Sequence, residues 1–285
     1  MIEWVKTQLR TRLPARIYGP IRARRVRGLV SRYEPRSADH EYAGFPLRVL
    51  LEDPLAEGWY DHDWDEPAEI TELRRGRLRP GARVLDVGAH QGIVGLILAR
   101  IVGPEGLVVA VEAEPHNAAV ARRNAAVNNA RNVTVVHAAV GARNGVLSFR
   151  EGLNGSVVRD ATPGAVEVRS LTVDELAERH GLPDVVLVDV EGYEAHVLAG
   201  ATRTIEAGAT DFFVELHSAE MLQAAGSTPD EVLGHFLDGP FEVVVAPVDE
   251  TPPGVGGAGA WRPADPGLYR RGRRCFVVAR PLVTT

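Results

Sequence analysis

The chain has 285 residues, of which 45% are hydrophobic and 25% are charged, with a net charge of −6; this composition is typical of globular proteins, and the length allows two domains or one large α/β domain with an extension. The longest strongly apolar stretch, Ile93–Ala99, is far shorter than the roughly 20 residues that cross a bilayer, and the first residues lack the order of a signal peptide, so a cytoplasmic protein is expected. The single cysteine, Cys275, excludes an internal disulfide and a zinc site built from several thiolates.

The first 32 residues differ in charge from the rest of the chain. They carry nine basic side chains and one acidic one, which leaves the remainder with a net charge of −14. Apolar residues at helical spacing (Ile2, Val5, Leu9, Leu13) predict a short amphipathic helix. Two interpretations stay open: residues 1–32 contact an anionic membrane or an acidic carrier protein, or they pack on the protein's own core or on the partner in a homodimer. Because the rest of the chain is acidic, a nucleic-acid substrate is not expected.

From Arg83 onward, short β-branched segments alternate with helical ones, as in a doubly wound parallel sheet. The first strands and helices are expected at Arg83–Val87, Gln91–Val102, Leu107–Glu112, Pro115–Asn128 and Val133–His137. After an inserted hairpin near residues 146–170, further elements are expected at Leu171–His180, Val185–Val190, Tyr193–Ala207, Asp211–Leu216, Pro229–Leu237, Phe241–Ala246 and Cys275–Arg280.

The last two of these strands follow each other with no helix between them, which predicts an antiparallel pair. We therefore expect an α/β fold: a doubly wound, Rossmann-like, seven-stranded sheet with a reversed last strand, plus an N-terminal helical extension. Residues 1–66 are expected to form the extension and cap, and residues 67–285 the α/β domain. A loop rich in glycine and proline, residues 251–267, joins the last two strands and is long enough to indicate mobility or function.

The first strand of the domain leads into a glycine-containing turn within Val84–Gly92. Gly88 and Gly92 let the backbone turn sharply and approach a ligand, and the helix that follows offers free N–H groups to a carboxylate. Glu112, at the end of the second strand, can accept hydrogen bonds from both hydroxyls of a ribose. The glycine spacing is not the dinucleotide fingerprint, which disfavours a nicotinamide-dependent oxidoreductase. Asp86 suits the ammonium group of S-adenosylmethionine better.

Several later segments extend this pattern into a family resemblance. They are Val84–Gly92, Val111–Pro115, Asn124, Asn128, Leu171–Leu176, Asp189–Glu194, Val197–Ala201 and Phe213–His217. On these segments, residues 65–217 resemble the FkbM-type methyltransferases, a branch of the class I S-adenosylmethionine-dependent enzymes. The chain departs from the family's usual pattern at His90, where Asn is common, and at Leu187, where Lys is common; the first departure is expected to alter contacts to the amino-acid end of the cofactor.

The resemblance implies that S-adenosylmethionine is the cofactor and that a glutamate, here Glu69, folds over its amino-acid part. The small residues after the third strand, around Ala138, could face the adenine. The cofactor-binding residues are therefore expected to be Glu69, Asp86, Gly88, Ala89, His90, Gly92, Glu112 and Ala138.

Acidic residues and a histidine follow two later strands, and the carboxyl ends of parallel strands meet at the edge of the sheet where ligands bind. Asp189, Glu215 and His217 are the expected catalytic residues. They could act as a general base, or could together hold Mg²⁺ or another hard divalent cation that lowers the pKa of an acceptor hydroxyl.

The resemblance implies O-methylation of a hydroxyl on a small molecule, a sugar or a natural product, in keeping with natural product biosynthesis. The alternative is a non-catalytic protein that keeps the cofactor fold and serves as a binding or scaffold protein, docking by its basic N-terminal segment. Release of S-adenosylhomocysteine would distinguish the two.

Overall fold

The computed structural model describes residues 28–158, 162, 164–249, 257–265, 269 and 274–282. Most of the basic N-terminal segment, residues 1–27, and parts of the loop at 251–267 lie outside the described residues. Contact with a membrane, a carrier protein or a second copy through residues 1–32 therefore stays a prediction. None of the described helices is both long and apolar enough to cross a bilayer.

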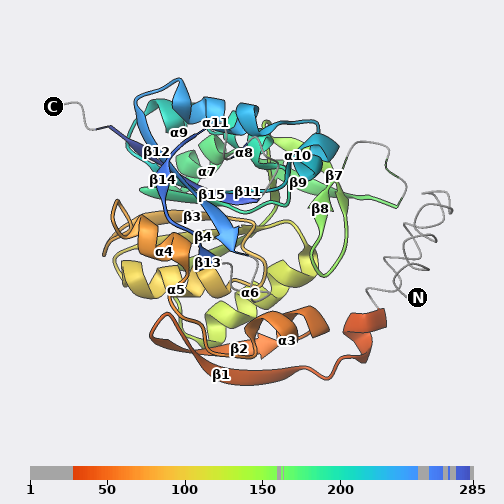
Figure 1. Cartoon of the computed structure of the whole chain (residues 1–285). Helices are drawn as coiled ribbons and strands as arrows, with labels where there is room; N and C mark the ends of the chain where they lie inside the picture. Colours follow the sequence, from red (N-terminus) through yellow and green to blue (C-terminus); the bar gives the residue numbers. More distant parts are fainter. Residues whose placement is uncertain are drawn as a thin grey trace.

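Seven strands form the body of the central sheet, in the order β12-β15-β11-β10-β3-β4-β5 (Figure 1). They are β3 (Arg83–Val87), β4 (Leu107–Glu112), β5 (Val133–His137), β10 (Val185–Val188), β11 (Asp211–Leu216), β12 (Phe241–Asp249) and β15 (Cys275–Pro281). Strand β15 is antiparallel to β11 and β12, whereas β3 is parallel to β4 and β10. The predicted doubly wound sheet with a reversed last strand is confirmed. Two short strands, β13 (Gly257–Ala258) and β14 (Arg262–Pro263), pair with β12.

Helices cover both faces of this sheet (Figure 1). One face carries α4 (Ala68–Leu73), α5 (Ile93–Val102) and α6 (Pro115–Val127), and the other α7 (Val173–His180), α8 (Glu194–Ala199), α9 (Thr202–Glu206), α10 (Ala219–Ala225) and α11 (Pro229–Leu237). Successive strand residues point to opposite faces, so Leu85 packs in one apolar cluster with Leu176, while Val84 packs in another with Ile97. The sheet is thus buried on both sides, which leaves the strand ends as the place where polar side chains gather.

The N-terminal extension is described from residue 28 onward, and this part contains strands as well as helix. Its described part contains an antiparallel hairpin of β1 (Arg36–Tyr42) and β2 (Phe45–Leu51). Leu47, Val49 and Leu51 are buried and alternate with more exposed neighbours, which is the two-residue period of a half-buried strand. Ala43 and Gly44 form the turn, with φ values of +52° and +80°.

Two asparagines of the family pattern hold this hairpin on α6. The side-chain Oδ1 of Asn124 accepts from the backbone N–H of Leu50 at 2.8 Å, and Oδ1 of Asn128 accepts from the backbone N–H of Arg48 at 3.0 Å. Nδ2 of Asn128 also donates to the carbonyl of Arg48 at 2.6 Å. The segment therefore joins the α/β domain through buried amide groups as well as apolar packing.

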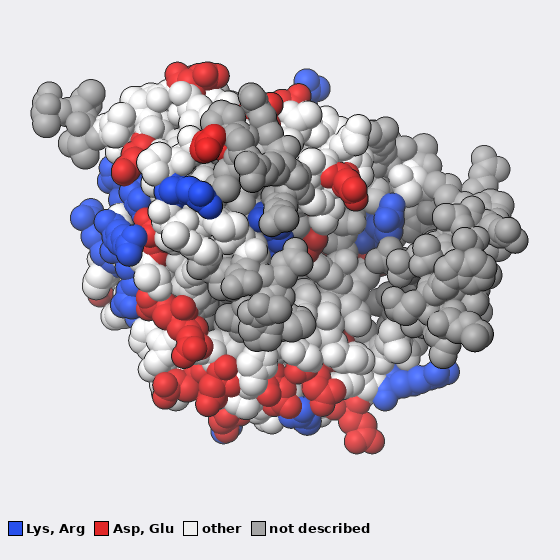
Figure 2. All heavy atoms as spheres, in the orientation of Figure 1, with Lys and Arg blue, Asp and Glu red and all other residues white. Residues whose placement is uncertain are grey.

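A short helix, α3 (Pro54–Tyr60), follows the hairpin. The carboxylate of Asp53 caps it by accepting from the backbone N–H groups of Leu55 and Ala56, both at 2.9 Å. Acidic side chains gather over this part of the surface (Figure 2). Among them, Glu57 and Asp61 pair with Arg36.

Between β5 and α7 the chain forms a second, smaller sheet in the order β6-β9-β7-β8. Its strands are β6 (Ala139–Val140), β7 (Gly145–Arg150), β8 (Ser156–Val157) and β9 (Val166–Leu171). The antiparallel pair β7 and β9 corresponds to the hairpin expected near residues 146–170, and β6 joins it from the end of the central sheet. The loop between β7 and β8 contains Leu153, whose carbonyl contacts His90 in the glycine-containing turn after β3.

Candidate active site

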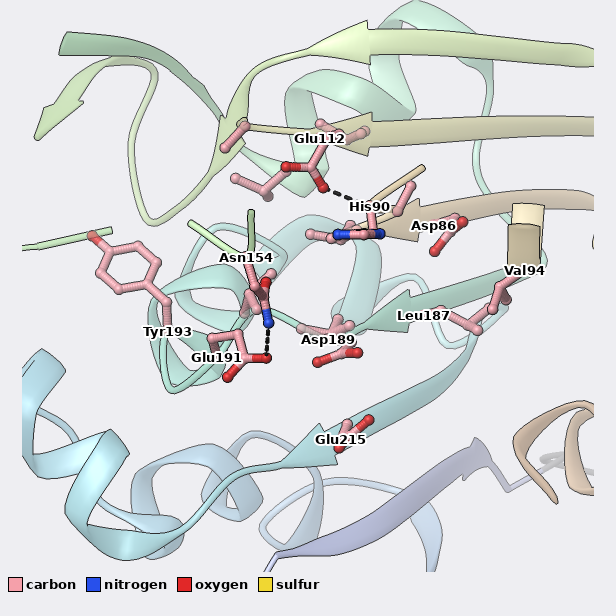
Figure 3. Close-up of a pocket in the computed structure, with 18 of the residues that line it drawn as sticks. Asp86, His90, Val94, Glu112, Asn154, Leu187, Asp189, Glu191, Tyr193 and Glu215 are labelled. Atoms are coloured by element: carbon pink, nitrogen blue, oxygen red, sulfur yellow. Dashed lines mark hydrogen bonds between the residues drawn. The ribbon is translucent and has the colours of Figure 1, made fainter. Parts of the chain in front are cut away.

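A cavity of about 520 Å³ opens at the carboxyl ends of β3, β4, β10 and β11 (Figure 3). Strand-end carboxylates, α3 and the inserted sheet all contribute to its walls. The expected site residues that line it are Glu69, Asp86, Gly88, Ala89, His90, Glu112, Ala138, Asp189 and Glu215. The fold thus brings together most of the residues that the sequence singled out.

Glycines shape the turn after β3. Gly88 has a φ of +92°, and a Cβ there would lie 1.8 Å from the carbonyl oxygen of Asp189, so the turn comes too close to the end of β10 for any side chain. Gly92, with a φ of +81°, begins α5 and packs on Ala121. Gly92 does not line the cavity, and its contribution in the described structure is to the turn rather than to a ligand.

Glu112 holds the turn in place. Its Oε2 accepts from the backbone N–H of His90 and its Oε1 from the backbone N–H of Glu114, both at 2.7 Å. Each oxygen keeps a further lone pair for a ligand hydroxyl. Burial raises the pKa of Glu112 to about 7.

Two further carboxylates, those of Asp86 and Glu69, line the cavity. Asp86 is 5% exposed, its Oδ2 has no hydrogen-bond partner among the described residues, and burial raises its pKa to about 7. Burial, with Glu215 and Asp86 nearby, also raises the pKa of Glu69 on α4 to about 7. These groups fit S-adenosylmethionine, because its ammonium and sulfonium charges and its ribose hydroxyls would be partners for buried carboxylates.

The imidazole of His90 has hydrogen-bond partners on two other segments of the chain. The residue has a φ of +48°, and its side chain bridges the hydroxyl of Tyr60 and the carbonyl of Leu153, at 2.6 and 3.1 Å. His90 lines the cavity, and the expected change in contacts at the amino-acid end of the cofactor stays a prediction.

Besides the carboxylates of Asp86, Glu112 and Glu69, a second cluster of charged side chains lies at the ends of β10 and β11. His217 is buried, and its Nδ1 lies 2.7 Å from Oε1 of Glu194. Its Nε2 lies 3.7 Å from Oδ1 of Asp189, 3.5 Å from Oε2 of Glu191 and 4.0 Å from Oε1 of Glu215. This nitrogen is buried and has no hydrogen-bond partner among the described residues. His217 does not itself line the cavity but lies directly behind Asp189, whose side chain is 49% exposed.

The charges in this cluster are strongly coupled. Burial lowers the pKa of His217, but the hydrogen bond to Glu194 and the carboxylate of Asp189 outweigh it and bring the pKa to about 10. Although the Asp189 side chain is half exposed to the cavity, desolvation by the surrounding walls and the carboxylate of Glu215 raise its pKa well above its ordinary value. Glu215 is engaged by Nε of Arg274, which reaches it from the start of β15. The cluster therefore contains a carboxylate that readily takes up a proton, next to a positive charge.

The same side chains could also hold a metal ion. One ligand atom each from Asp189, Glu215 and His217 can lie within 4.8 Å of one another. A carboxylate behind the histidine, here Glu194, is the usual arrangement for orienting a metal-binding imidazole. The donors suit a hard divalent cation, although Arg274 already occupies Glu215.

Sequence reasoning missed three residues of the site. Glu194 is explained in the sequence by the start of a helix, yet it is fully buried and orients His217. Asn154, in the inserted loop, donates to Oε1 of Glu191 at 2.8 Å across the cavity (Figure 3). Tyr60 lies in a stretch whose acids suggest a solvated surface, although its two neighbouring tryptophans were a signal of burial.

The chain is similar to a family model and to several known proteins. A family model described as the methyltransferase FkbM domain matches residues 86–238. The tRNA (adenine(58)-N(1))-methyltransferase TrmI of Thermus thermophilus is 53% identical over 47 residues, 16% of this chain and 18% of that protein. Protein-L-isoaspartate O-methyltransferase 1 of Archaeoglobus fulgidus is 44% identical over 59 residues, 21% of this chain and 27% of that protein. The chain thus matches less than a third of the length of either relative.

Two solved structures give longer alignments at low identity. Methyltransferase FkbM from Methylobacillus flagellatus KT is 17% identical, with 69% of this chain and 43% of that chain covered and a TM-score of 0.42. A SAM-dependent O-methyltransferase from Thermotoga maritima is also 17% identical, with 87% and 79% covered and a TM-score of 0.43. The family model covers more than half of the chain and includes both clusters at the strand ends except Glu69 and Arg274, so the chain belongs to the FkbM family of S-adenosylmethionine-dependent methyltransferases.

Proposed function

We propose that this protein transfers the methyl group of S-adenosylmethionine to a hydroxyl oxygen of a small molecule, a sugar or a natural product. The observation that carries the proposal is the placement of Asp189, an open carboxylate of raised pKa, between the cofactor cavity and the buried imidazole of His217. Such a carboxylate can accept the proton that a hydroxyl loses when it attacks the methyl carbon.

The upper half of the cavity in Figure 3 would hold the cofactor. Glu112 would accept from the ribose hydroxyls, Asp86 and Glu69 would face the ammonium group, and the backbone near Ala138 would face the adenine. The bound cofactor supplies an electrophilic methyl group on a positively charged sulfur. The task left to the protein is to align the acceptor oxygen and to remove its proton.

The residues around Asp189 suit that task. In the proposed reaction the hydroxyl proton moves to Asp189, and the positive charge of His217 stabilises the aspartate before the transfer. Glu194 keeps His217 oriented and charged through the 2.7 Å hydrogen bond. We favour a general base over a divalent cation held by Asp189, Glu215 and His217, because Arg274 already pairs with Glu215.

The proposal is tested by the atom that receives the methyl group. The protein is incubated with cofactor carrying a radiolabelled methyl group and with polyhydroxylated acceptors, and S-adenosylhomocysteine and labelled product are measured. We expect label in an alkali-stable methyl ether. Label on nitrogen, on carbon or in an alkali-labile ester would contradict O-methylation of a hydroxyl. Cofactor binding with no S-adenosylhomocysteine formed from any acceptor would support the scaffold alternative.

Cofactor affinity is expected to fall as the pH is lowered from 8 to 6. The pKa values of Asp86 and Glu112 are about 7 without the cofactor, and the cofactor binds their ionised forms, so binding releases protons near neutrality. The dissociation constant should rise about tenfold for each carboxylate that must ionise. Calorimetry in two buffers of different ionisation enthalpy measures the proton release directly, and an affinity that stays constant over this pH range would show that neither carboxylate contacts the cofactor.

A further inference from the structure

The imidazole of His90 has two partners that come from separate segments of the chain. Its Nδ1 lies 2.6 Å from the hydroxyl of Tyr60, at the end of α3, and its Nε2 lies 3.1 Å from the carbonyl oxygen of Leu153, in the inserted loop. A carbonyl can only accept, so Nε2 carries the proton and Nδ1 accepts from Tyr60. Burial lowers the pKa of His90 to about 4, so the ring is neutral and keeps this pattern near neutral pH.

The next residue in the turn, Gln91, holds the other end of α3. Its Nε2 donates to Oδ2 of Asp53 at 2.6 Å, while Oδ1 of Asp53 caps the first turn of α3. His116 reaches the same Oδ2 at 3.0 Å. Two consecutive residues of the turn after β3 therefore contact the two ends of α3: His90 contacts Tyr60 at its C-terminal end, and Gln91 contacts Asp53 at its N-terminal end.

This turn also carries the backbone contact to the expected ribose site. The N–H of His90 donates to Glu112 at 2.7 Å (Figure 3). Trp59 and Tyr60 of α3 line the same cavity, and the ring of Trp59 lies 5.0 Å from that of His90. A displacement of α3 would thus open one wall of the cavity and disturb the turn that positions Glu112.

We propose that His90 is a positioning residue: its side chain, through Tyr60 and Leu153, connects the cap and the inserted loop to the turn after β3, and so keeps that turn in the shape that binds the cofactor. We expect this positioning role of His90 to change the affinity for the cofactor. It does not depend on Asp189 acting as the base, and it can fail or hold independently of the acceptor chemistry proposed above.

The variant Tyr60→Phe removes one hydroxyl and keeps the ring. We expect the dissociation constant and the KM for S-adenosylmethionine to rise about threefold to tenfold, as for the loss of one buried hydrogen bond. The dissociation rate should rise by a similar factor, while kcat at saturating cofactor stays within about twofold because the reacting groups are not touched. Tyr33→Phe is the matched control, since Tyr33 does not line the cavity and its ring packs on the apolar cluster beneath the cap.

The second variant is His90→Asn. Asparagine tolerates the positive φ of this position and keeps the backbone N–H for Glu112, but it is too short to reach both Tyr60 and Leu153. If the contacts of His90 with Tyr60 and Leu153 act as a unit, the double variant Tyr60→Phe/His90→Asn should bind the cofactor no more weakly than His90→Asn alone.

Three results would overturn the inference. A normal cofactor affinity in Tyr60→Phe, with a weakened one in His90→Asn, would mean that His90 contacts the cofactor itself. Additive losses in the double variant would mean that the two side chains act separately. A loss of kcat at unchanged affinity would place the Tyr60 hydroxyl in the chemical step.

Discussion

Replacing Glu112 with alanine is expected to weaken the binding of S-adenosylmethionine by about two orders of magnitude, the effect of losing two hydrogen bonds to a charged group. The substitution removes the acceptor for the ribose hydroxyls. It also releases the backbone N–H groups of His90 and Glu114, each now held at 2.7 Å, so the turn loses its preorganised shape. Calorimetric titration of the variant with the cofactor measures this loss.

A matched control separates this local effect from the loss of one negative charge. Glu105→Ala changes the net charge equally at an exposed position just before β4, at the opposite end of the strand from the cavity. It should bind the cofactor normally. The Glu112 variant should stay folded, as judged by its circular dichroism spectrum and a cooperative thermal transition, because burial of an ionised Glu112 without a cation costs free energy. An unchanged affinity in folded Glu112→Ala would assign the ribose to other residues.

The second large effect is expected at Asp189. Asp189→Asn should lower the rate of S-adenosylhomocysteine release at saturating cofactor by about 10²-fold to 10⁴-fold, the usual contribution of a general base. An amide cannot take up the hydroxyl proton, yet it has nearly the same size, so the dissociation constant of the cofactor should change little. Glu206→Gln, an exposed position in α9, is a control for the loss of one carboxylate.

Chelation distinguishes the two ways in which Asp189 can act. With a general base, EDTA leaves the wild-type rate unchanged and the acidic limb of the pH profile disappears in the Asp189 variant. With a bound cation, EDTA abolishes turnover, Mg²⁺ restores it, and His217→Ala and Glu215→Gln lose the response to metal as well. Near-full activity in Asp189→Asn would show that the acceptor is activated by other residues.

Local patterns in the sequence are enough to predict the central sheet and the position of the cofactor turn, because each strand and helix has its own periodicity and the ends of parallel strands necessarily converge. Glu112 and Asp189 could be located in this way. The pairing of Glu215 with Arg274 could not, because the partners are 59 residues apart and meet only through the register of β11 and β15. The same holds for the contact of Tyr60 with His90.

The N-terminal hairpin shows a different limit of prediction from local sequence patterns. The helical spacing of Ile2 to Leu13 predicts a helix at the start of the extension and cap, whereas Leu47, Val49 and Leu51 follow the two-residue period of a strand. A short alternation of this kind is weak evidence when read alone, since an isolated two-stranded hairpin is barely stable. Its stability here comes from α6, which no local pattern in the hairpin reveals.

The asparagines of α6 have a further consequence for the behaviour of the protein in concentrated solution. The outer edge of β2 would otherwise present the N–H groups of Arg48 and Leu50 as an open template for a strand of another molecule. Asn124 and Asn128 take these donors and, at Arg48, the carbonyl as well, so the edge is closed by side chains of the same chain. Two residues of the family pattern thereby protect the hairpin from intermolecular strand pairing and so from aggregation.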